Sequence, residues 1–267
     1  MEQQLVDAAT NGHVKDLQAL LRDNPAVDVN WRDFNGWTAL HYASRNDHAE
    51  VAKLLLAHPS IDVNLQASDG STSFSFGCVR GAVSVVIMLL KDHRVDVSLD
   101  NVNGFTPLLQ AASWGQYEVI EWLIASGRDL AIHSKGRECG KDQTALAIAR
   151  QRRNIGVVSL LERFVANPAL TRRELRVKFG VLDGVAAEIF AAMIFLCDEL
   201  LQIRRTRASH QKSAAADATR FLVIAKKLPM ELQMVLSYRV VGSRKMNVLR
   251  RESEAAFKDL ARILLLD

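Results

Sequence analysis

Three cysteines and seven histidines are the side chains of this 267-residue chain that metal sites and nucleophilic catalysis most often use. Cys78, Cys139 and Cys197 lie far apart and have no second Cys or His at a metal-ligand spacing. We interpret them as buried or incidental thiols of an intracellular protein. The histidines accompany no Gly-x-Ser-x-Gly, His-Glu-x-x-His or glycine-rich phosphate motif. The sequence therefore predicts a non-enzymatic protein with no metal or cofactor site.

The charged residues are divided unevenly along the chain. The whole sequence has 34 Lys and Arg against 30 Asp and Glu, and this formal charge of +4 is too small to indicate a nucleic-acid-binding protein. Residues 1–164 contain 16 basic and 19 acidic residues, whereas residues 165–267 contain 18 and 11. With 49% hydrophobic and 24% charged residues, the composition is that of a folded chain. We expect two parts that differ in charge and in architecture.

A 34-residue repeat positions the side chains of the first part. Three sets of residues recur at this spacing. The first is Val27-Asp28-Val29-Asn30, Ile61-Asp62-Val63-Asn64 and Val95-Asp96-Val97-Ser98. The others are Gly36, Gly70 and Gly104, and Thr38, Thr72 and Thr106. A fifth copy begins at Thr144, and its extra length falls in the loop 135–143. The opening copy, residues 5–21, is partial. Such a fixed period predicts stacked structural repeats.

Each copy contains the signals of two helices. The Gly allows a turn with positive φ, and the hydroxyl of the following Thr can accept a hydrogen bond from the first helical turn. Small residues such as Ala43 and Ala111 allow first helices to approach closely. The Leu-rich second helix cannot bury its apolar stripe alone, so the copies must share one core. Phe74 and Gly77 replace Leu and Ala in the third copy, which predicts local repacking there.

These residues resemble the ankyrin repeat. Thr38-Ala39-Leu40-His41 and Thr106-Pro107-Leu108 are similar to its Thr-Pro-Leu-His turn, and Asp28-Val29-Asn30 is similar to its hairpin motif. The resemblance covers residues 1–164 and implies an all-α solenoid of about five helix pairs joined by short hairpin loops. We expect residues 165–180 to form a basic joining segment and residues 181–267 to form a small helical C-terminal domain.

The resemblance also implies a function and a surface for it. Ankyrin-like arrays bind protein partners on a concave face of hairpin tips and first helices, so we expect a scaffold or adaptor protein. The corresponding positions are Phe34, Asn35, Trp37, Arg45, Asn46, Ser68, Asp69, Ser71, Val79, Arg80, Val102, Asn103, Phe105, Ser113 and Trp114. Trp37 and Phe105 have the alternative of packing across neighbouring hairpins. Trp114, just before Gly115, is expected to face solvent and to contact a partner.

A second resemblance concerns Asn64. It follows Asp62-Val63, and Leu56 lies eight residues before it, in a pattern similar to the one hydroxylated by the hypoxia-linked asparaginyl hydroxylase in ankyrin proteins. The resemblance implies that Asn64 is a hydroxylation site. The alternative is an Asn whose side chain binds its own hairpin backbone.

Residues 150–178 contain eight basic residues against only Glu162 and Glu174. Such a run is typical of a solvated face, and the alternatives are a docking patch for an acidic partner or weak nucleic-acid contact. Aromatic residues do not alternate with these charges. We therefore do not expect nucleic acid among the partners.

Helical patterns continue after residue 180. The segment 181–205 is apolar on nearly all sides, but only residues 189–197 are uninterrupted, whereas about 18 apolar residues are needed to span a bilayer. We interpret it as a core helix and expect no membrane contact. Further helices are predicted over 219–227, 230–238 and 253–266. No secretion signal opens the sequence, so a cytoplasmic location is expected, with the nucleus as the alternative.

The segment from Leu228 to about Leu266 resembles an F-box. Its docking helix would include Leu228, Pro229, Glu231 and Leu232, and Ala256-Phe257 begins a segment similar to the closing helix. F-box-like segments end certain viral ankyrin proteins and dock the Skp subunit of a cullin ubiquitin ligase. The resemblance implies a substrate adaptor with ubiquitin-ligase subunits as partners. The alternative is an ordinary Pro-started amphipathic helix in a separate helical domain.

Overall fold

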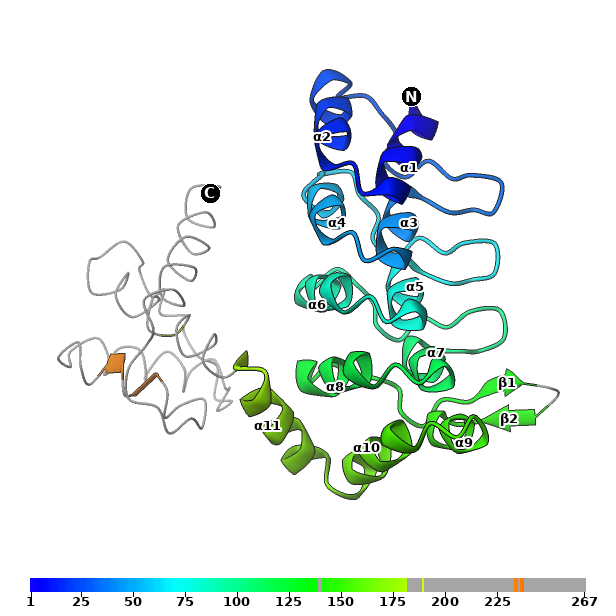
Figure 1. Cartoon of the computed structure of the whole chain (residues 1–267), viewed down its shortest axis with the longest axis vertical. Coiled ribbons are helices and arrows are strands. Elements are labelled where there is room, and N and C mark those ends of the chain that lie inside the picture. Colours follow the sequence, from blue (N-terminus) through cyan, green and yellow to red (C-terminus); the bar gives the residue numbers. More distant parts are fainter. Residues whose placement is uncertain (139–140, 182–188, 190–232, 235, 238–267) are drawn as a thin grey trace, which may run out of the picture. The chain divides into compact units, whose positions relative to one another are not determined.

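The computed structural model describes residues 1–138, 141–181, 189, 233–234 and 236–237 of the chain. Two compact units divide the chain, Met1–Leu175 and Arg176–Asp267. In the first unit, helix pairs are stacked one above another, and the loops between pairs project to one side (Figure 1). The pairs are α1 Glu2–Asn11 with α2 Val14–Asp23, α3 Ala39–Arg45 with α4 Ala49–Leu56, α5 Ser73–Arg80 with α6 Val83–Lys91, α7 Pro107–Trp114 with α8 Tyr117–Ser126, and α9 Ala145–Gln151 with α10 Ile155–Ala166.

The helices form two rows with the core between and within them (Figure 1). The first helices α1, α3, α5, α7 and α9 contact one another in chain order, and so do the second helices α2, α4, α6, α8 and α10. Ala43, Ala111 and Ala112 are fully buried where neighbouring first helices meet. Leu55 and Leu89, from second helices, are also fully buried. The predicted continuous core is therefore confirmed, and the fold is mostly helical.

The third helix pair has a larger side chain in its core than the pairs next to it. Phe74 is fully buried in the position that Leu40 and Leu108 occupy in other pairs. Gly77 lies where those pairs have Ala, and a Cβ atom there would be 3.1 Å from Cγ2 of Val86. Both replacements therefore lie in the core, and the local repacking that they predict stays a prediction.

Threonine begins each of the first helices from α3 onward. The Oγ1 atoms of Thr72, Thr106 and Thr144 accept hydrogen bonds from the backbone three residues later, at 3.2, 3.4 and 3.4 Å. Thr38 instead pairs with His41, whose Nδ1 atom lies 2.8 Å from the Thr38 hydroxyl and accepts the Thr38 backbone N–H at 3.1 Å. The predicted capping role of threonine is confirmed, because these contacts satisfy backbone groups that a helix start leaves unpaired.

Successive hairpin loops are hydrogen-bonded to one another through their backbones. The amide of Ser68 donates to the carbonyl of Asn35 at 3.0 Å, and the amide of Val102 donates to that of Asp69 at 3.0 Å. Gly70 makes this close approach possible, because its φ is +79° and a Cβ atom would lie 2.8 Å from the Val102 backbone nitrogen. The predicted positive-φ turn is confirmed, and glycine is needed for space as well as for conformation.

One part of the fold differs from the all-helical expectation. The loop 135–143 contains an antiparallel pair of short strands, β1 Gly136–Glu138 and β2 Lys141–Gln143. The amide of Arg137 donates to the carbonyl of Asn103 at 2.8 Å, so β1 continues the row of bonded hairpins. The extra residues of the fifth copy therefore extend a hairpin, because the backbone groups of an extended loop need partners.

The segment 165–180 is helical over most of its length. Residues 165–166 end α10, and α11 runs over Pro168–Lys178. Thr171 and Leu175 are buried, and the Thr171 hydroxyl donates to the Arg163 carbonyl at 3.1 Å. The first compact unit accordingly reaches Leu175.

Few of the residues after 181 are described. Residues 181, 189, 233–234 and 236–237 are helical, and the rest of the helices predicted over 181–205 and 230–238 lies outside the described residues. The remaining predicted C-terminal helices lie outside the described residues, as do Cys139 and Cys197. Within the described ranges, every helix is too short or too polar to cross a bilayer.

Replacing Gly70 with Ala should lower the free energy of unfolding by about 2 kcal/mol, because Ala would be strained at this φ and its Cβ would collide with backbone. Gly104→Ala is the matched control. It has a similar φ of +73°, but its Cβ would meet the Lys135 carbonyl oxygen only at 3.2 Å. Urea denaturation followed by circular dichroism measures both. Equal losses would show that backbone strain, and not the close approach of hairpins, decides the effect.

Candidate functional site

An aromatic cluster lies where the second and third helix pairs meet. The Trp37 ring is 4.4 Å from the Phe76 ring and 5.0 Å from the Tyr42 ring, and the Arg45 guanidinium lies 5.2 Å above it. Trp37 is only partly exposed. The packing alternative for Trp37 is therefore the one that the structure supports, with Arg45 as a cation on its outer side.

Asp33 holds the first hairpin in place beside this cluster. Its Oδ1 atom accepts the backbone amides of Asn35 at 2.9 Å and Trp37 at 2.8 Å, and its Oδ2 atom accepts the Tyr42 hydroxyl at 2.7 Å. Burial opposes ionisation of Asp33, but these hydrogen bonds outweigh it and lower its pKa. Burial and the Asp33 carboxylate raise the pKa of Tyr42 to about 12. In the fourth copy, Asn101 Oδ1 accepts the amides of Asn103 and Phe105 in the same way.

A pocket of about 280 Å³ lies between the third and fourth copies. Its lining consists of hairpin residues and residues of the first helices α5 and α7, namely Asp69, Ser71, Phe76, Val79, Asn101, Asn103, Phe105, Gln110, Ser113 and Trp114. The structure thus brings together most of the residues predicted from these two copies. It adds Phe76, Asn101 and Gln110, which sequence reasoning missed. Phe76 and Gln110 follow Tyr42 at steps of 34, so the repeat itself contained a signal for them.

The side chains predicted to bind a partner differ in how far they are exposed to solvent. Trp114 is 66% exposed, and the hairpin-tip residues Phe34 and Val102 are 92% and 71% exposed. Asn35, Arg45, Asn46, Ser68, Asp69, Arg80 and Asn103 are exposed, and Val79 and Ser113 are partly exposed. Trp114 therefore faces solvent as predicted.

Two predicted positions are engaged within the protein. Ser71 is 4% exposed, and its hydroxyl donates to Asp69 Oδ2 at 3.0 Å, so the side chain is engaged in its own hairpin and its contact with a partner stays a prediction. The hydroxyl is small enough to be covered by its own hairpin. Phe105 is partly exposed, and a Cβ atom added to Gly136 would lie 2.6 Å from its ring, so the ring packs on the β1 backbone. The packing alternative also holds for Phe105.

His41 connects two copies below this surface. It is fully buried, with its Nε2 atom 3.3 Å from the Ser71 carbonyl oxygen and its Nδ1 atom bound to Thr38. Burial lowers the pKa of His41 to about 4, since a charged imidazole would lose its hydration there. Burial likewise raises the pKa of the Cys78 thiol, which is fully buried as predicted. Neither group is available for chemistry at the surface.

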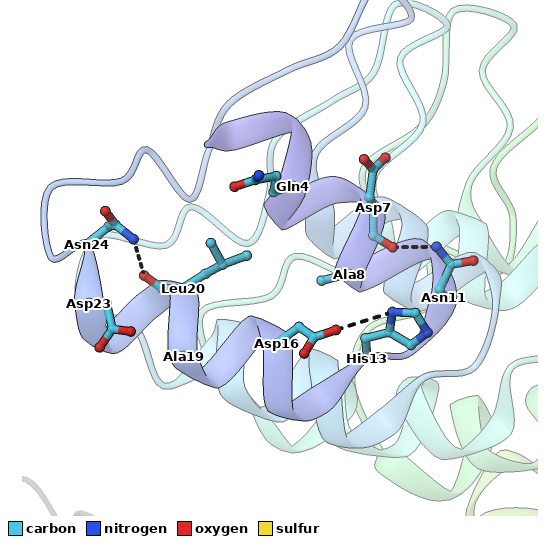
Figure 2. A pocket seen from close by; sticks show the side chains of 10 residues that line it. All are labelled: Gln4, Asp7, Ala8, Asn11, His13, Asp16, Ala19, Leu20, Asp23 and Asn24. Atoms are coloured by element: carbon cyan, nitrogen blue, oxygen red, sulfur yellow. Dashed lines mark hydrogen bonds and ion pairs between the residues drawn. The ribbon is translucent and has the colours of Figure 1, made fainter.

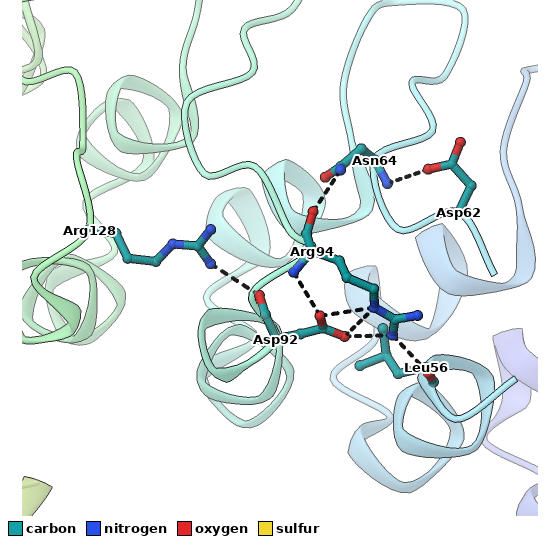
Figure 3. Close-up of polar contacts among 6 residues, drawn as sticks. All are labelled: Leu56, Asp62, Asn64, Asp92, Arg94 and Arg128. Carbon is teal, nitrogen blue, oxygen red and sulfur yellow. Dashed lines mark hydrogen bonds and ion pairs between the residues drawn. The ribbon is translucent and has the colours of Figure 1, made fainter. Parts of the chain in front are cut away.

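Asn64 binds the following copy through both the nitrogen and the oxygen of its side-chain amide, and Figure 3 shows the contact with Arg94. Its Nδ2 donates to the Arg94 carbonyl at 2.8 Å, and its Oδ1 accepts the Asp96 amide at 2.8 Å. Asn30 makes the equivalent contacts with Ser60 and Asp62. The Asn64 side chain therefore joins neighbouring copies and does not bind its own hairpin, and hydroxylation of this residue stays a prediction.

Arginine side chains anchor the loop that contacts the Asn64 side chain (Figure 3). Arg94 pairs with Asp92 at 2.7 Å and donates to the Leu56 carbonyl at 2.9 Å, and Arg128 donates to the carbonyls of Asp92 and Val95. The second, third and fourth copies are thus connected on this side by both neutral and charged hydrogen bonds.

Several basic residues of 150–178 make contacts within the repeat unit. Arg150 pairs with Glu162 at 2.6 Å, and Arg163 pairs with Glu174 at 2.5 Å. Arg172 donates to the Ile124 carbonyl at 3.3 Å and lies 5.8 Å from the Phe164 ring centre. These arginines therefore join α10 and α11 to the array, which accounts for part of the basic run without a ligand.

A larger pocket, of about 470 Å³, lies between α1 and α2 (Figure 2). Asp7, Asp16 and Asp23 line it, and His13 Nδ1 is 3.5 Å from Asp16. Among the described residues, no cluster of three His, Cys, Asp or Glu side chains could hold a metal ion. A polar, acidic lining is also what solvation of a terminal repeat requires, so this pocket does not by itself indicate a site.

Comparison with known proteins identifies the repeat. A family model described as ankyrin repeats in three copies matches residues 4–67 and 59–134. The fifth copy lies beyond this match, although its helices α9 and α10 continue both rows. No match was found among curated proteins.

The stability of the fold should fall as the pH is lowered from 6.5 to 4 because of His41. Above pH 6.5 the imidazole is neutral in both the folded and the unfolded chain. Below it, only the unfolded chain takes up the proton until the folded pKa of about 4 is reached. The loss approaches about 3 kcal/mol at pH 4. Urea denaturation at several pH values measures it.

His41→Ser is the matched variant, since Ser75 occupies the equivalent position of the third copy beside Thr72. We expect this variant to be less stable at pH 7 and to lose stability less steeply between pH 6.5 and 4. Identical pH slopes for the two proteins would show that His41 does not titrate in this range.

Proposed function

Because this chain belongs to the ankyrin-repeat proteins, whose repeats are protein-interaction modules, we propose that the pocketed face of its third and fourth repeats binds a protein partner without catalysis. The observation that carries the proposal is the 66% exposure of Trp114 beside the 280 Å³ pocket. A large aromatic side chain held in water at the end of a rigid helix has apolar area left to bury. Trp is the residue type most enriched among energetic hot spots of interfaces.

The repeats support this role by holding the surface in place. Trp114 ends α7, whose preceding residues Ala111 and Ala112 are fully buried between neighbouring helices. Phe105, at the other side of the pocket, is packed on β1. A partner would therefore meet side chains whose backbone is already ordered, so binding would cost little conformational entropy on this side.

Trp114→Ala tests the proposal. We expect the variant to keep the thermal stability of the wild type, because the side chain is mostly exposed, and to lose partner affinity by at least about tenfold. Ile155→Ala is the matched control: its side chain is 80% exposed but does not line the pocket. Affinity capture followed by quantitative binding measures both. Unchanged partner binding by Trp114→Ala would contradict the proposal, and a large loss of stability would contradict the assigned exposure.

A finer proposal is that the protein is a substrate adaptor of a cullin ubiquitin ligase. It is supported by the F-box-like sequence, whose residues Leu228, Pro229, Glu231 and Leu232 lie outside the described residues. The described residues 233–234 and 236–237 are helical, and Ser237 is fully buried. This agrees with an amphipathic helix at that point but does not distinguish an F-box from another helical domain.

Co-purification of Skp and cullin subunits with the full chain tests the adaptor proposal. Leu232→Asp should abolish their recovery, because a charged side chain would disrupt an apolar docking helix. Binding through the repeats should continue, which Trp114-dependent capture monitors in the same variant. If the wild-type chain recovers no ligase subunit, the adaptor proposal fails and the binding proposal is unaffected.

A further inference from the structure

The exposed end of each first helix carries a residue at the same position of the repeat. Counted eight residues from the threonine caps, these residues are Asn46, Arg80, Trp114 and Arg152, and all are exposed. Because consecutive first helices are neighbours, Arg80 and Arg152 come from the helices on the two sides of α7, which carries Trp114. The exposed aromatic side chain of the proposed binding face is thus flanked by cationic positions.

Arg80 places an exposed positive charge at the C-terminal end of α5, next in sequence to a pocket-lining residue. It follows Val79, which lines the pocket together with Phe76. Among the described residues Arg80 has no ion-pair partner, in contrast to Arg150 and Arg163, which bind glutamates. Arg45, one copy earlier, also has no ion pair in the described part of the chain and lies over the Trp37 ring. Two guanidinium groups at the helix ends of this face are therefore not neutralised by a described carboxylate.

The hairpin edge of the pocket has the reverse character. Asp69 is exposed there, and its carboxylate accepts the amide and the hydroxyl of Ser71. Asn101 and Asn103 line the same hairpin edge. An anion at this edge would meet the Asp69 charge, whereas an anion at the helix ends would meet Arg80. The electrostatic contrast across the pocket therefore favours one orientation of a charged partner.

The volume of the pocket suits a protein side chain. Pockets that enclose small molecules measure about 300–1,000 Å³, and this one, at about 280 Å³, lies just below that range and is polar along one edge. One large apolar side chain could enter between Phe105 and Trp114 and remain attached to a segment that continues across the face.

We propose that this face recognises an acidic protein segment that inserts one aromatic or large aliphatic side chain between Phe105 and Trp114 and directs its carboxylates to Arg80 and Arg45. This inference rests on the proposed function and names the chemistry of its partner. The carbonyl ends of α3 and α5 would by themselves disfavour an anion, so the arginines carry the preference for acidic residues.

A random peptide library displayed on phage and selected on the full-length chain tests the inference. Peptides that also bind Trp114→Ala are removed first, so only those that use the pocketed face remain. We expect the retained sequences to combine Asp or Glu with Trp, Phe or Leu. Selection on Arg80→Glu in parallel should shift the flanking residues toward Lys and Arg, because the charge at the end of α5 is reversed.

Fluorescence polarisation with a synthetic peptide from the selection gives the quantitative test. We expect Arg80→Glu to weaken the binding of the acidic peptide by about tenfold or more and Ile155→Ala to leave its affinity unchanged. Added salt should also weaken its binding. Trp114-dependent peptides that are neutral or basic, or an acidic peptide insensitive to Arg80→Glu, would overturn the inference and leave the binding function standing. Recovery of no Trp114-dependent peptide would overturn both, and tighter binding of single-stranded DNA than of peptide would overturn the acidic-segment assignment.

Discussion

The structure depends on one constraint: no helix pair of this chain can bury its apolar residues without the pairs next to it. Ala43 and Ala111 allow the first helices to meet, and Leu55 and Leu89 fill the row behind them. The energy of the fold is therefore mostly that of interfaces between neighbours. Hydrogen bonds follow the same pattern, because Asn30, Asn64 and His41 each bind a backbone group of the next copy. A change in one copy therefore alters the stability of its neighbours, and distant copies are coupled only through the copies between them.

This constraint also explains why the proposed binding surface lies where it does. Positions between copies are committed to packing, so chemical variety is confined to the hairpin edges and to the exposed ends of the first helices. At the latter position the chain has Asn46, Arg80, Trp114 and Arg152, one neutral, one aromatic and two cationic residues. Placing them on consecutive helices converts a difference along the sequence into a pattern of charge and apolar area across one face. The proposed partner is read from that pattern, and not from the fold, which many unrelated functions share.

The expectations that several independent sequence signals shared were the ones that the structure confirmed. Period, threonine caps and glycine turns all predict the same helix pairs, and the structure has them. Expectations about individual side chains were less secure. Ser71 and Phe105 occupy positions that are often exposed in such arrays, yet Ser71 is covered by its own hairpin and Phe105 lies on Gly136. The strands β1 and β2 were also missed, because a nine-residue loop of polar residues has no alternation of apolar side chains to indicate pairing.

The sequence by itself determined the repeat, its register, the order of the helices and the residues that could lie on the binding face. These follow from spacing, because each copy repeats the same local signals and must stack to bury them. Only the tertiary structure decided which aromatic residues are free to meet a partner. Trp37 and Phe105 are partly covered by atoms of neighbouring copies, whereas Trp114, the last residue of α7, is 66% exposed, and the pocket beside it lies between two copies. The physical reason is that exposure is a property of a side chain and its neighbours in space, and those neighbours lie about one repeat, 34 residues, away in the sequence.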